Sequence, residues 1–269
     1  MTTEHSTYVI GDIHGQFKRL VGLLQSAGLI GNALEWTAGA STLWFMGDFV
    51  DRGPDGIPVI DLVMRLQAEA AAVNGSVASL LGNHEILLLA AYRFGRRSTG
   101  LGSSFLSKWK HNGGNRKDLA SLKLEHLDWL ADLPAMAHVD DYLFMHADAP
   151  LYFKYGRSVQ EVNVAIKDLL HRSDTLAWEE LLEDFVKRGI FYSDTHGEVF
   201  VQRFLDLYGG QCLVHGHTPI SHMLGCQPKK VTSPLLYAAG RCVNVDAGLH
   251  LGGHGFVSRL PFSSDEGIE

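Results

Sequence analysis

The feature that most constrains the fold is a unit that occurs three times in the first half of the chain. Each unit has a short apolar run, a turn of glycine followed by aspartate or asparagine, and then an amphipathic stretch. Strand, turn and helix in this order form βαβ units, which predict a right-handed, largely parallel sheet. The runs expected as strands are residues 8–10, 42–46 and 77–81, and the stretches expected as helices are residues 17–25, 59–72 and 86–92.

The second half of the chain adds short apolar runs and two further amphipathic stretches, without any internal repeat. We expect one α/β domain over residues 1–269, with a mobile polar insertion at 96–104 and a frayed acidic tail at 263–269. The additional strands are expected at residues 142–145, 212–214, 243–246 and 255–260, and the helices at residues 159–170 and 178–186.

Composition excludes several classes of partner. Hydrophobic residues make up 46% of the 269 residues, which is enough for a buried core. The 23 Lys and Arg against 30 Asp and Glu give a net charge of −7, which argues against general affinity for nucleic acid or anionic lipid. The chain has neither an apolar run near the roughly 20 residues of a membrane span nor the pattern of a signal peptide. The three cysteines form no CxxC pair, which suits a reducing compartment. We expect a soluble, cytoplasmic protein, and a monomer.

Each of five expected strands is followed by side chains that can bind metal ions. The carboxyl ends of parallel strands form the edge where ligands bind in open α/β sheets, so these side chains should meet there. Asp12 and His14 are two residues apart, which places both on one face of an extended segment. The five segments are residues 11–15 (GDIHG), 47–53 (GDFVDRG), 82–85 (GNHE), His146 and residues 215–218 (HGHT).

Aspartate and imidazole together favour borderline cations such as Mn, Fe or Zn over Mg or Ca. The ligands are too numerous for one tetrahedral ion, and two ions that share a bridging carboxylate fit better. Such a pair, about 3.5–4 Å apart, holds the attacking and leaving oxygens of a phosphoryl displacement. We therefore expect two divalent ions, with Mn as the first choice and Fe or Zn as the alternatives.

With these five blocks in order, the chain resembles the calcineurin-like metallophosphoesterases, in particular the PPP branch of serine/threonine protein phosphatases and its bacterial members. The resemblance covers most of the chain and includes GDxHG, GDxVDRG, GNHE, a lone histidine after a strand, and Gly-His. It implies a four-layer α/β/β/α sandwich of two mixed sheets flanked by helices, with the active site at the strand C-termini. Pro219 stands where many relatives outside this branch have a second metal-binding histidine, which favours the PPP branch.

The resemblance also implies roles for single residues. His84 would be the general acid, oriented by Asp51, and Arg52 would bind phosphate oxygens together with Asn83. A second phosphate-binding arginine is expected between His146 and Gly216, with Arg188 as the first choice and Arg172 as the second. The implied metal ligands are Asp12, His14, Asp48, Asn83, His146 and His217, with Asp48 bridging the two ions. In a purely structural interpretation Asn83 is a helix N-cap, and the two roles are compatible.

Other positions depart from the family pattern or stay open. The family usually has Ala-Gly after the lone histidine, whereas this chain has Asp148 there, either as an acidic wall or as the acceptor of a turn hydrogen bond. The stretch 110–114 resembles an Asn-Gly-Gly segment that lies near the substrate in bacterial members. The loop 248–255 lacks the substrate-contacting tyrosine of eukaryotic members, and its His250 and His254 either border the site or have no part in it.

The function implied is that of a dinuclear metallophosphatase. Its substrate would be a phosphoprotein carrying phosphoserine or phosphothreonine, or also phosphotyrosine. A hydroxide bridging the two metals would attack in line, and His84 would protonate the leaving alkoxide. Two alternatives remain: a hydrolase of dinucleoside polyphosphates or other small phosphoesters, and a non-catalytic scaffold that kept the fold. The motifs indicate phosphoester hydrolysis but say almost nothing about the identity of the leaving group.

Overall fold

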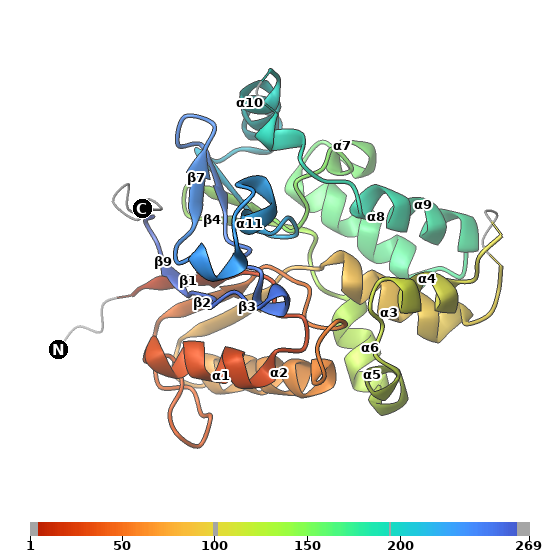
Figure 1. The fold of residues 1–269 in the computed structure, drawn as a ribbon, viewed down its shortest axis with the longest axis horizontal. Helices are drawn as coiled ribbons and strands as arrows, with labels where there is room; N and C mark the ends of the chain where they lie inside the picture. The colour runs from red at the N-terminus through yellow and green to blue at the C-terminus, as the bar shows by residue number, and fades with distance from the viewer. Residues whose placement is uncertain (1–4, 99–101, 194, 263–269) are drawn as a thin grey trace.

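Two mixed β-sheets form the centre of the computed structural model, which describes residues 5–98, 102–193 and 195–262 (Figure 1). The first sheet has the strand order β3-β2-β1-β9. Its three parallel strands confirm the βαβ prediction, although two of the predicted runs extend beyond the strands into the turns that carry the polar residues. These strands are β1 (Thr7–Ile10), β2 (Thr42–Phe45) and β3 (Ser76–Ser79), and β9 (Ser258–Arg259) pairs antiparallel to β1.

The second sheet has the order β4-β5-β6-β8-β7. Its central strands run parallel and were expected from the sequence: β5 (Tyr142–Met145), β6 (Cys212–His215) and β8 (Cys242–Asn244). The edge strands β4 (Met136–Val139) and β7 (Leu235–Tyr237) are antiparallel and were not expected. β7 turns into β8 through Ala238 and Ala239, both at positive φ, and alanine gives no turn signal in a sequence.

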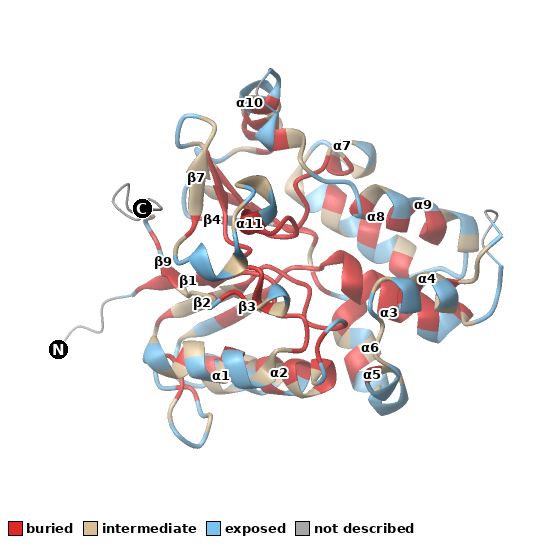
Figure 2. Ribbon diagram, in the orientation of Figure 1, coloured by how far each residue is buried: buried red, intermediate tan, exposed pale blue. Residues whose placement is uncertain are grey.

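The two sheets pack face to face. Buried residues from both sheets form one apolar cluster that includes Val9 of β1, Phe144 of β5 and Val214 of β6. Helices cover the outer faces, and Figure 2 shows the buried strands between them. α1 (Phe17–Ser26) and α2 (Gly56–Ala71) lie along the first sheet. The predicted fold, two mixed sheets flanked by helices, is confirmed.

Most of the remaining helices lie beside the two sheets, on the right of Figure 1. α3 (Asn83–Phe94), α8 (Val159–His171) and α9 (Thr175–Phe185) match the predicted helices within a few residues. α10 (Gly197–Tyr208) was not predicted, although its buried residues have helical spacing. The other unpredicted helices are too short to show a period: α4 (Phe105–His111), α5 (Arg116–Ser121), α6 (Leu124–Ala131), α7 (Tyr152–Tyr155) and α11 (Ile220–Met223).

Three sequence expectations concern segments away from the sheets. The insertion expected at 96–104 lies partly outside the described residues, and its described part forms an isolated antiparallel bridge between Ser98 and Ser104. The tail 263–269 lies wholly outside them. Among the described residues, no helix combines the length and apolar character needed to cross a bilayer.

Candidate functional site

The turns after β1 and β2 are joined by backbone hydrogen bonds. The amides of Ile13 and His14 both donate to the carbonyl of Asp48, at 3.0 and 2.8 Å, and the amide of Gly15 donates to Phe49. These bonds hold the GDIHG turn against the GDFVDRG turn. Residues 34 positions apart in sequence, such as His14 and Asp48, therefore lie side by side. The predicted convergence at this sheet edge is therefore present in the structure.

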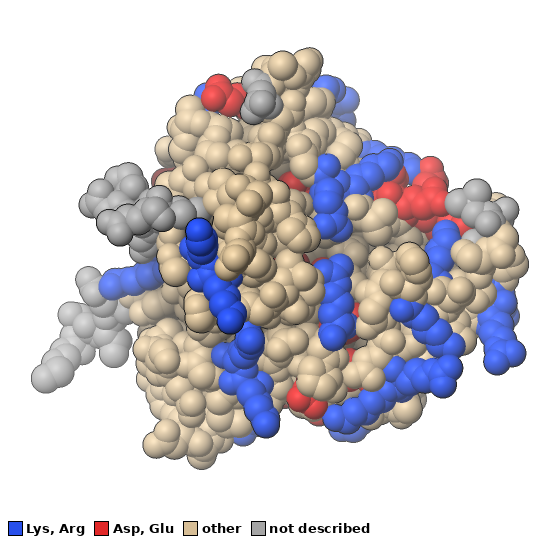
Figure 3. All heavy atoms as spheres, viewed as in Figure 1, with Lys and Arg blue, Asp and Glu red and all other residues tan. Residues whose placement is uncertain are grey.

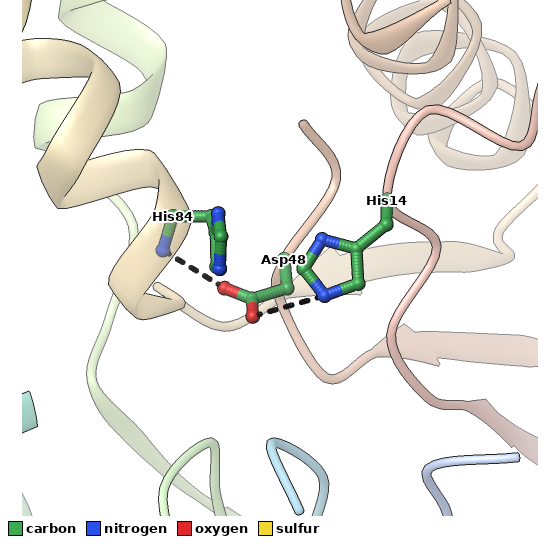
Figure 4. Close-up of side chains that lie close together, drawn as sticks. All are labelled: His14, Asp48 and His84. Carbon is green, nitrogen blue, oxygen red and sulfur yellow. Dashed lines mark hydrogen bonds and ion pairs between the residues drawn. The ribbon is translucent and has the colours of Figure 1, made fainter. Parts of the chain in front are cut away.

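Asp48 lies at the centre of the site, between two histidines. Its Oδ2 is 3.5 Å from Nε2 of His14, and its Oδ1 is 3.4 Å from Nε2 of His146. Figure 4 shows the first of these contacts and a hydrogen bond from the amide of His84 to Oδ1. Two groups of potential ligands share this carboxylate: His14, Asp48 and His84, and Asp48, His146 and His217.

Asn83 and Asp12 complete the two sides of the site. Oδ1 of Asn83 lies 2.9 Å from Nδ1 of His217 and 3.2 Å from Nε2 of His146, so three potential ligands face one point. On the other side, Oδ2 of Asp12 lies 3.9 Å from Nε2 of His14. The structure thus brings together the whole set of ligands that the sequence predicts.

Second hydrogen bonds orient two of the imidazoles. Nδ1 of His14 lies 3.0 Å from the carbonyl of Val50, and Nδ1 of His146 lies 2.7 Å from the carbonyl of Met46. A carbonyl can only accept, so Nδ1 carries a proton in both rings, and Nε2 is the nitrogen that faces Asp48. This arrangement, with one ring nitrogen anchored and the other free, is typical of metal-binding histidines.

Unsatisfied buried atoms show that the site fits cations. Asp12 Oδ2 and His217 Nε2 are fully buried and have no hydrogen-bond partner among the described residues. Such atoms are costly unless a ligand occupies the space beside them. Gly82 and Gly216 leave room for the carboxylates, because a Cβ there would lie 2.2 Å from Asp48 Oδ1 and 2.4 Å from Asp12 Oδ1.

The buried carboxylates of the site also favour a bound positive charge. Burial raises the pKa of Asp12 well above its usual value, and the neighbouring carboxylate of Asp246 raises it further. For His146, burial opposes protonation, but the charge and hydrogen bond of Asp48, the charge of Asp12 and the carbonyl of Met46 together outweigh it and raise the pKa to about 10. Burial lowers the pKa values of His14 and His217, which keeps both rings neutral. Without a metal, a proton on His146 would have to compensate the carboxylates.

Backbone strain is concentrated at the site. Ten residues other than glycine have positive φ in the described chain, and half of them belong to the predicted site. Non-glycine residues avoid this region, at a cost on the order of 1–2 kcal/mol each, unless the surrounding structure holds them there. The five are His14, Asp48, Asp51, Arg52 and His217, with φ between 47° and 67°.

His84 lies beside the shared carboxylate and has both ring nitrogens occupied by neighbours. Nδ1 is 2.8 Å from Oδ2 of Asp51, and Nε2 is 3.0 Å from Nη2 of Arg52. The other oxygen of Asp51 accepts a 2.7 Å hydrogen bond from Nε1 of Trp109, a buried residue that carries no sequence signal for this role. Both ring nitrogens of His84 thus already have a protein partner, although the ring also belongs to the first group of potential ligands.

The segment that contains Arg188 is attached to the site by Asp148. Oδ2 of Asp148 accepts from the amide of Gly189 at 2.6 Å, and Oδ1 accepts from the hydroxyl of Thr218 at 2.7 Å. Asp148 thus accepts hydrogen bonds, but from two segments far from it in sequence and not within its own turn, which neither alternative from the sequence described. Arg188 is exposed, and its charge lowers the pKa of His217, after the larger effects of burial and of the charge of His146. Arg172, the second choice, is the C-cap of α8, and its carbonyl accepts a hydrogen bond from Nε1 of Trp178.

Two buried carboxylates contribute although the sequence analysis gave them no role. Glu85, the last residue of GNHE, accepts from the amides of Asp48 and Phe49, both at 2.8 Å, and thereby fixes the turn of the shared ligand. Asp246 accepts from Gly248 at 2.9 Å, and its Oδ2 is buried with no hydrogen-bond partner in the part of the chain that the structure describes. Glu85 lay within a recognised block, whereas Asp246 was expected only as part of a strand.

Asp246 predicts a pH dependence for the metal-free protein. Burial raises its pKa to about 6, above the ordinary 3.8. A carboxyl whose folded pKa is raised contributes stability below about pH 4 that is lost as pH rises to about 6. We expect Asp246→Asn to be more stable than the parent protein above pH 6, by on the order of 2 kcal/mol. Chemical denaturation at several pH values checks this, and a difference that shrinks as pH rises would contradict it.

Comparison with known proteins agrees with this geometry. A family model described as calcineurin-like phosphoesterase matches residues 5–221. Shewanella-like protein phosphatase 1 of Plasmodium berghei is 27% identical over 232 residues, which cover 80% of this chain and 62% of that protein. The symmetrical bis(5'-nucleosyl)-tetraphosphatase of Cronobacter sakazakii is 42% identical over 87 residues, which cover 32% of this chain and 26% of that protein.

Solved structures show the same fold. A cold-active protein-tyrosine phosphatase of a psychrophilic Shewanella species superposes with a TM-score of 0.73 at 20% identity and covers 95% of this chain and 75% of its own. A protein serine/threonine phosphatase from Saccharomyces cerevisiae gives a TM-score of 0.59 at 19% identity, over 100% of this chain and 78% of its own. The family match extends over most of the chain and includes both groups of potential ligands. The chain therefore belongs to the calcineurin-like phosphoesterase family.

Proposed function

We propose that this protein is a dinuclear metal-dependent phosphomonoester hydrolase that acts on phosphoserine or phosphothreonine in proteins, or on phosphotyrosine as well. The observation that supports this most strongly is the placement of Asp48 between His14 on one side and His146 and His217 on the other, with the His84–Asp51 pair and Arg52 beside it. A carboxylate shared in this way suits a two-ion site for phosphoryl transfer.

In this proposal the chain holds one ion between Asp12, His14 and Asp48 and the other between Asp48, Asn83, His146 and His217. Divalent ions held there would neutralise phosphoryl oxygens and lower the pKa of a water molecule. Manganese suits the mixture of carboxylate, amide and imidazole ligands, and iron or zinc would suit it as well. Glu85 supports the site from behind, through its bonds to the turn of Asp48.

In this proposal Arg52 binds the phosphate and His84 protonates the leaving group. An arginine can only donate, so in its present contact with Arg52, Nε2 of His84 accepts and Nδ1 donates its proton to Asp51. A phosphate that draws the guanidinium toward its own oxygens would free Nε2 of His84 to carry a proton to the leaving alkoxide. Asp51 stabilises the protonated ring, and Trp109 holds the other oxygen of Asp51 in place.

The surface around the site suits an anionic substrate. Although the chain carries a net charge of −7, the face in Figure 3 presents Lys and Arg side chains over its central region, and the acidic side chains gather mainly near α9 and α10. We assign Arg188 as the second phosphate ligand, because Asp148 attaches its segment beside His217 and its charge reaches that ring. Positive charge at this entrance would attract phosphorylated substrates.

A phosphoprotein substrate has the broader support, because the likeness to the Plasmodium phosphatase extends over 80% of this chain. The likeness to the tetraphosphatase of Cronobacter sakazakii covers 32% of the chain at higher identity. A dinucleoside polyphosphate is therefore the second candidate, and the residues that would hold the metals and the reacting phosphate are the same for both.

A comparison of substrates separates the two candidates. We expect the metal-loaded protein to hydrolyse phosphoserine and phosphothreonine peptides with a kcat/KM at least about tenfold above that for diadenosine tetraphosphate, a difference of about 1.4 kcal/mol in transition-state binding. The same peptides without phosphate, added as competitors, control for simple peptide binding. A reversed preference would establish the second candidate. Full metal occupancy with no hydrolysis of any phosphoester would indicate a binding scaffold.

A further inference from the structure

The loop after β8 brings a histidine to the mouth of the site. Asp246 fixes the start of this loop by accepting from the amide of Gly248, and Arg19 of α1 fixes its end by donating to the carbonyl of Gly253 at 2.6 Å. Between these two anchors the chain forms a short turn that carries His250. The position of this side chain is therefore set by contacts to two different parts of the molecule.

His250 contacts both the metal side and the substrate side of the site. Its ring packs edge-on against that of His14, with the centroids 4.5 Å apart. Its Nε2 lies 2.7 Å from Nη1 of Arg52. The guanidinium has no lone pair to offer, so Nε2 of His250 is the acceptor and the imidazole is neutral.

Arg52 needs such a partner, because it is exposed and has a long flexible side chain. Its backbone is fixed by a positive φ and by a 2.8 Å bond from its amide to Gly113. The guanidinium itself is held by two imidazoles, His84 on Nη2 and His250 on Nη1. When a phosphate displaces the contact with His84, the contact with His250 still defines the plane of the guanidinium.

On the basis of the proposed phosphatase function, we propose that His250 is a positioning residue for Arg52. It accepts a hydrogen bond from Nη1 and turns the guanidinium so that its remaining N–H groups face the phosphate oxygens. Bidentate binding of phosphate depends on the orientation of this plane, so the loss of His250 should weaken phosphate binding more than it changes the chemical step.

Substitution of His250 by glutamine or asparagine tests its two ring nitrogens separately. Glutamine places a carbonyl oxygen near the position of Nε2, whereas asparagine places its amide nearer the position of Nδ1. His250→Gln should therefore retain the contact with Arg52, and His250→Ala and His250→Asn should lose it. His254 lies on the same loop and is exposed, so His254→Ala serves as the matched control.

Two readouts on the metal-loaded protein test the proposal: the affinity for inorganic phosphate by calorimetry, and KM and kcat on a phosphopeptide. We expect His250→Ala to weaken phosphate binding and raise KM by about tenfold, with kcat changed less than threefold, as for the loss of one hydrogen bond to a charged group. His250→Gln should recover most of the affinity, and His254→Ala should match the parent protein. In an Arg52→Ala background, His250→Ala should have almost no further effect.

Three results would overturn the proposal. The first is an unchanged phosphate affinity in His250→Ala, and the second is a phosphate affinity of His250→Gln no higher than that of His250→Asn. The third is simple additivity of the effects of Arg52→Ala and His250→Ala. A parent protein that binds metal but neither binds phosphate nor hydrolyses phosphoesters would overturn the proposed function, and this inference with it. A fully active parent protein with unaffected His250 variants would overturn this inference alone.

Discussion

His84→Ala should lower kcat on phosphoserine peptides by roughly 10²–10⁴-fold, the usual contribution of a general acid, while both metal ions stay bound. The reason lies in the contacts of its ring: Nδ1 is held by Asp51 and Nε2 faces Arg52, so neither nitrogen is available as a ligand. Enzyme kinetics together with elemental analysis of the purified variant measure both quantities.

The leaving group provides the control for this prediction. An alkoxide such as serine needs a proton to depart, whereas p-nitrophenolate departs readily without one. His84→Ala should therefore lose much less activity on p-nitrophenyl phosphate than on the phosphopeptide, and Asp51→Asn should show the same trend to a smaller degree. Equal losses on both substrates, or a loss of metal, would show that His84 is a ligand or a structural residue.

Asp48→Asn should remove both ions together. Asp48 is the one carboxylate that belongs to both ligand groups, and its two oxygens face different histidines, His14 and His146. An amide of the same shape keeps one acceptor oxygen but loses the negative charge and the second acceptor. We expect the affinity for both metals to fall by at least about 100-fold, beyond the 10–100-fold typical of residues around the ligands. Activity should fall with metal content.

Titration of the metal-free variant with Mn²⁺ by calorimetry measures this effect. Asp55→Asn is the matched control, because Asp55 lies on the same connection after β2 but pairs with Lys117 at the surface. The control should bind two ions as the parent protein does. If Asp48→Asn loses one ion and binds the other normally, Asp48 does not bridge.

The sequence predicted the part of the fold that depends on strong periodicity. The three parallel strands of the first sheet and the helices that follow them have apolar residues at regular spacing, and all were found. The edge strands β4 and β7 are three or four residues long and are defined by pairing with a neighbour, which a local pattern does not contain. The short helices α4 to α7 were not predicted either, because a helix of one or two turns shows no periodicity in the sequence.

The site was predictable to the extent that it consists of residues directly after strands. Asp12, Asp48 and His217 could be placed by combining strand ends with the family motifs. Trp109 could not, because it reaches the site from a segment with no sequence pattern for it and acts through a contact with Asp51. For His250 the sequence left open whether it borders the site, and its contact with Arg52 appears only in the structure. The positive φ angles at the site were equally hidden, because Asp, His and Arg at these positions give no reliable signal for a left-handed turn.

The measurement that bears most directly on the account is an anomalous-scattering map from crystals grown with Mn²⁺. The account predicts two peaks, one on either side of the Asp48 carboxylate, with Asp12 and His14 at the first and Asn83, His146 and His217 at the second. A single peak, or peaks that Asp48 does not join, would contradict it.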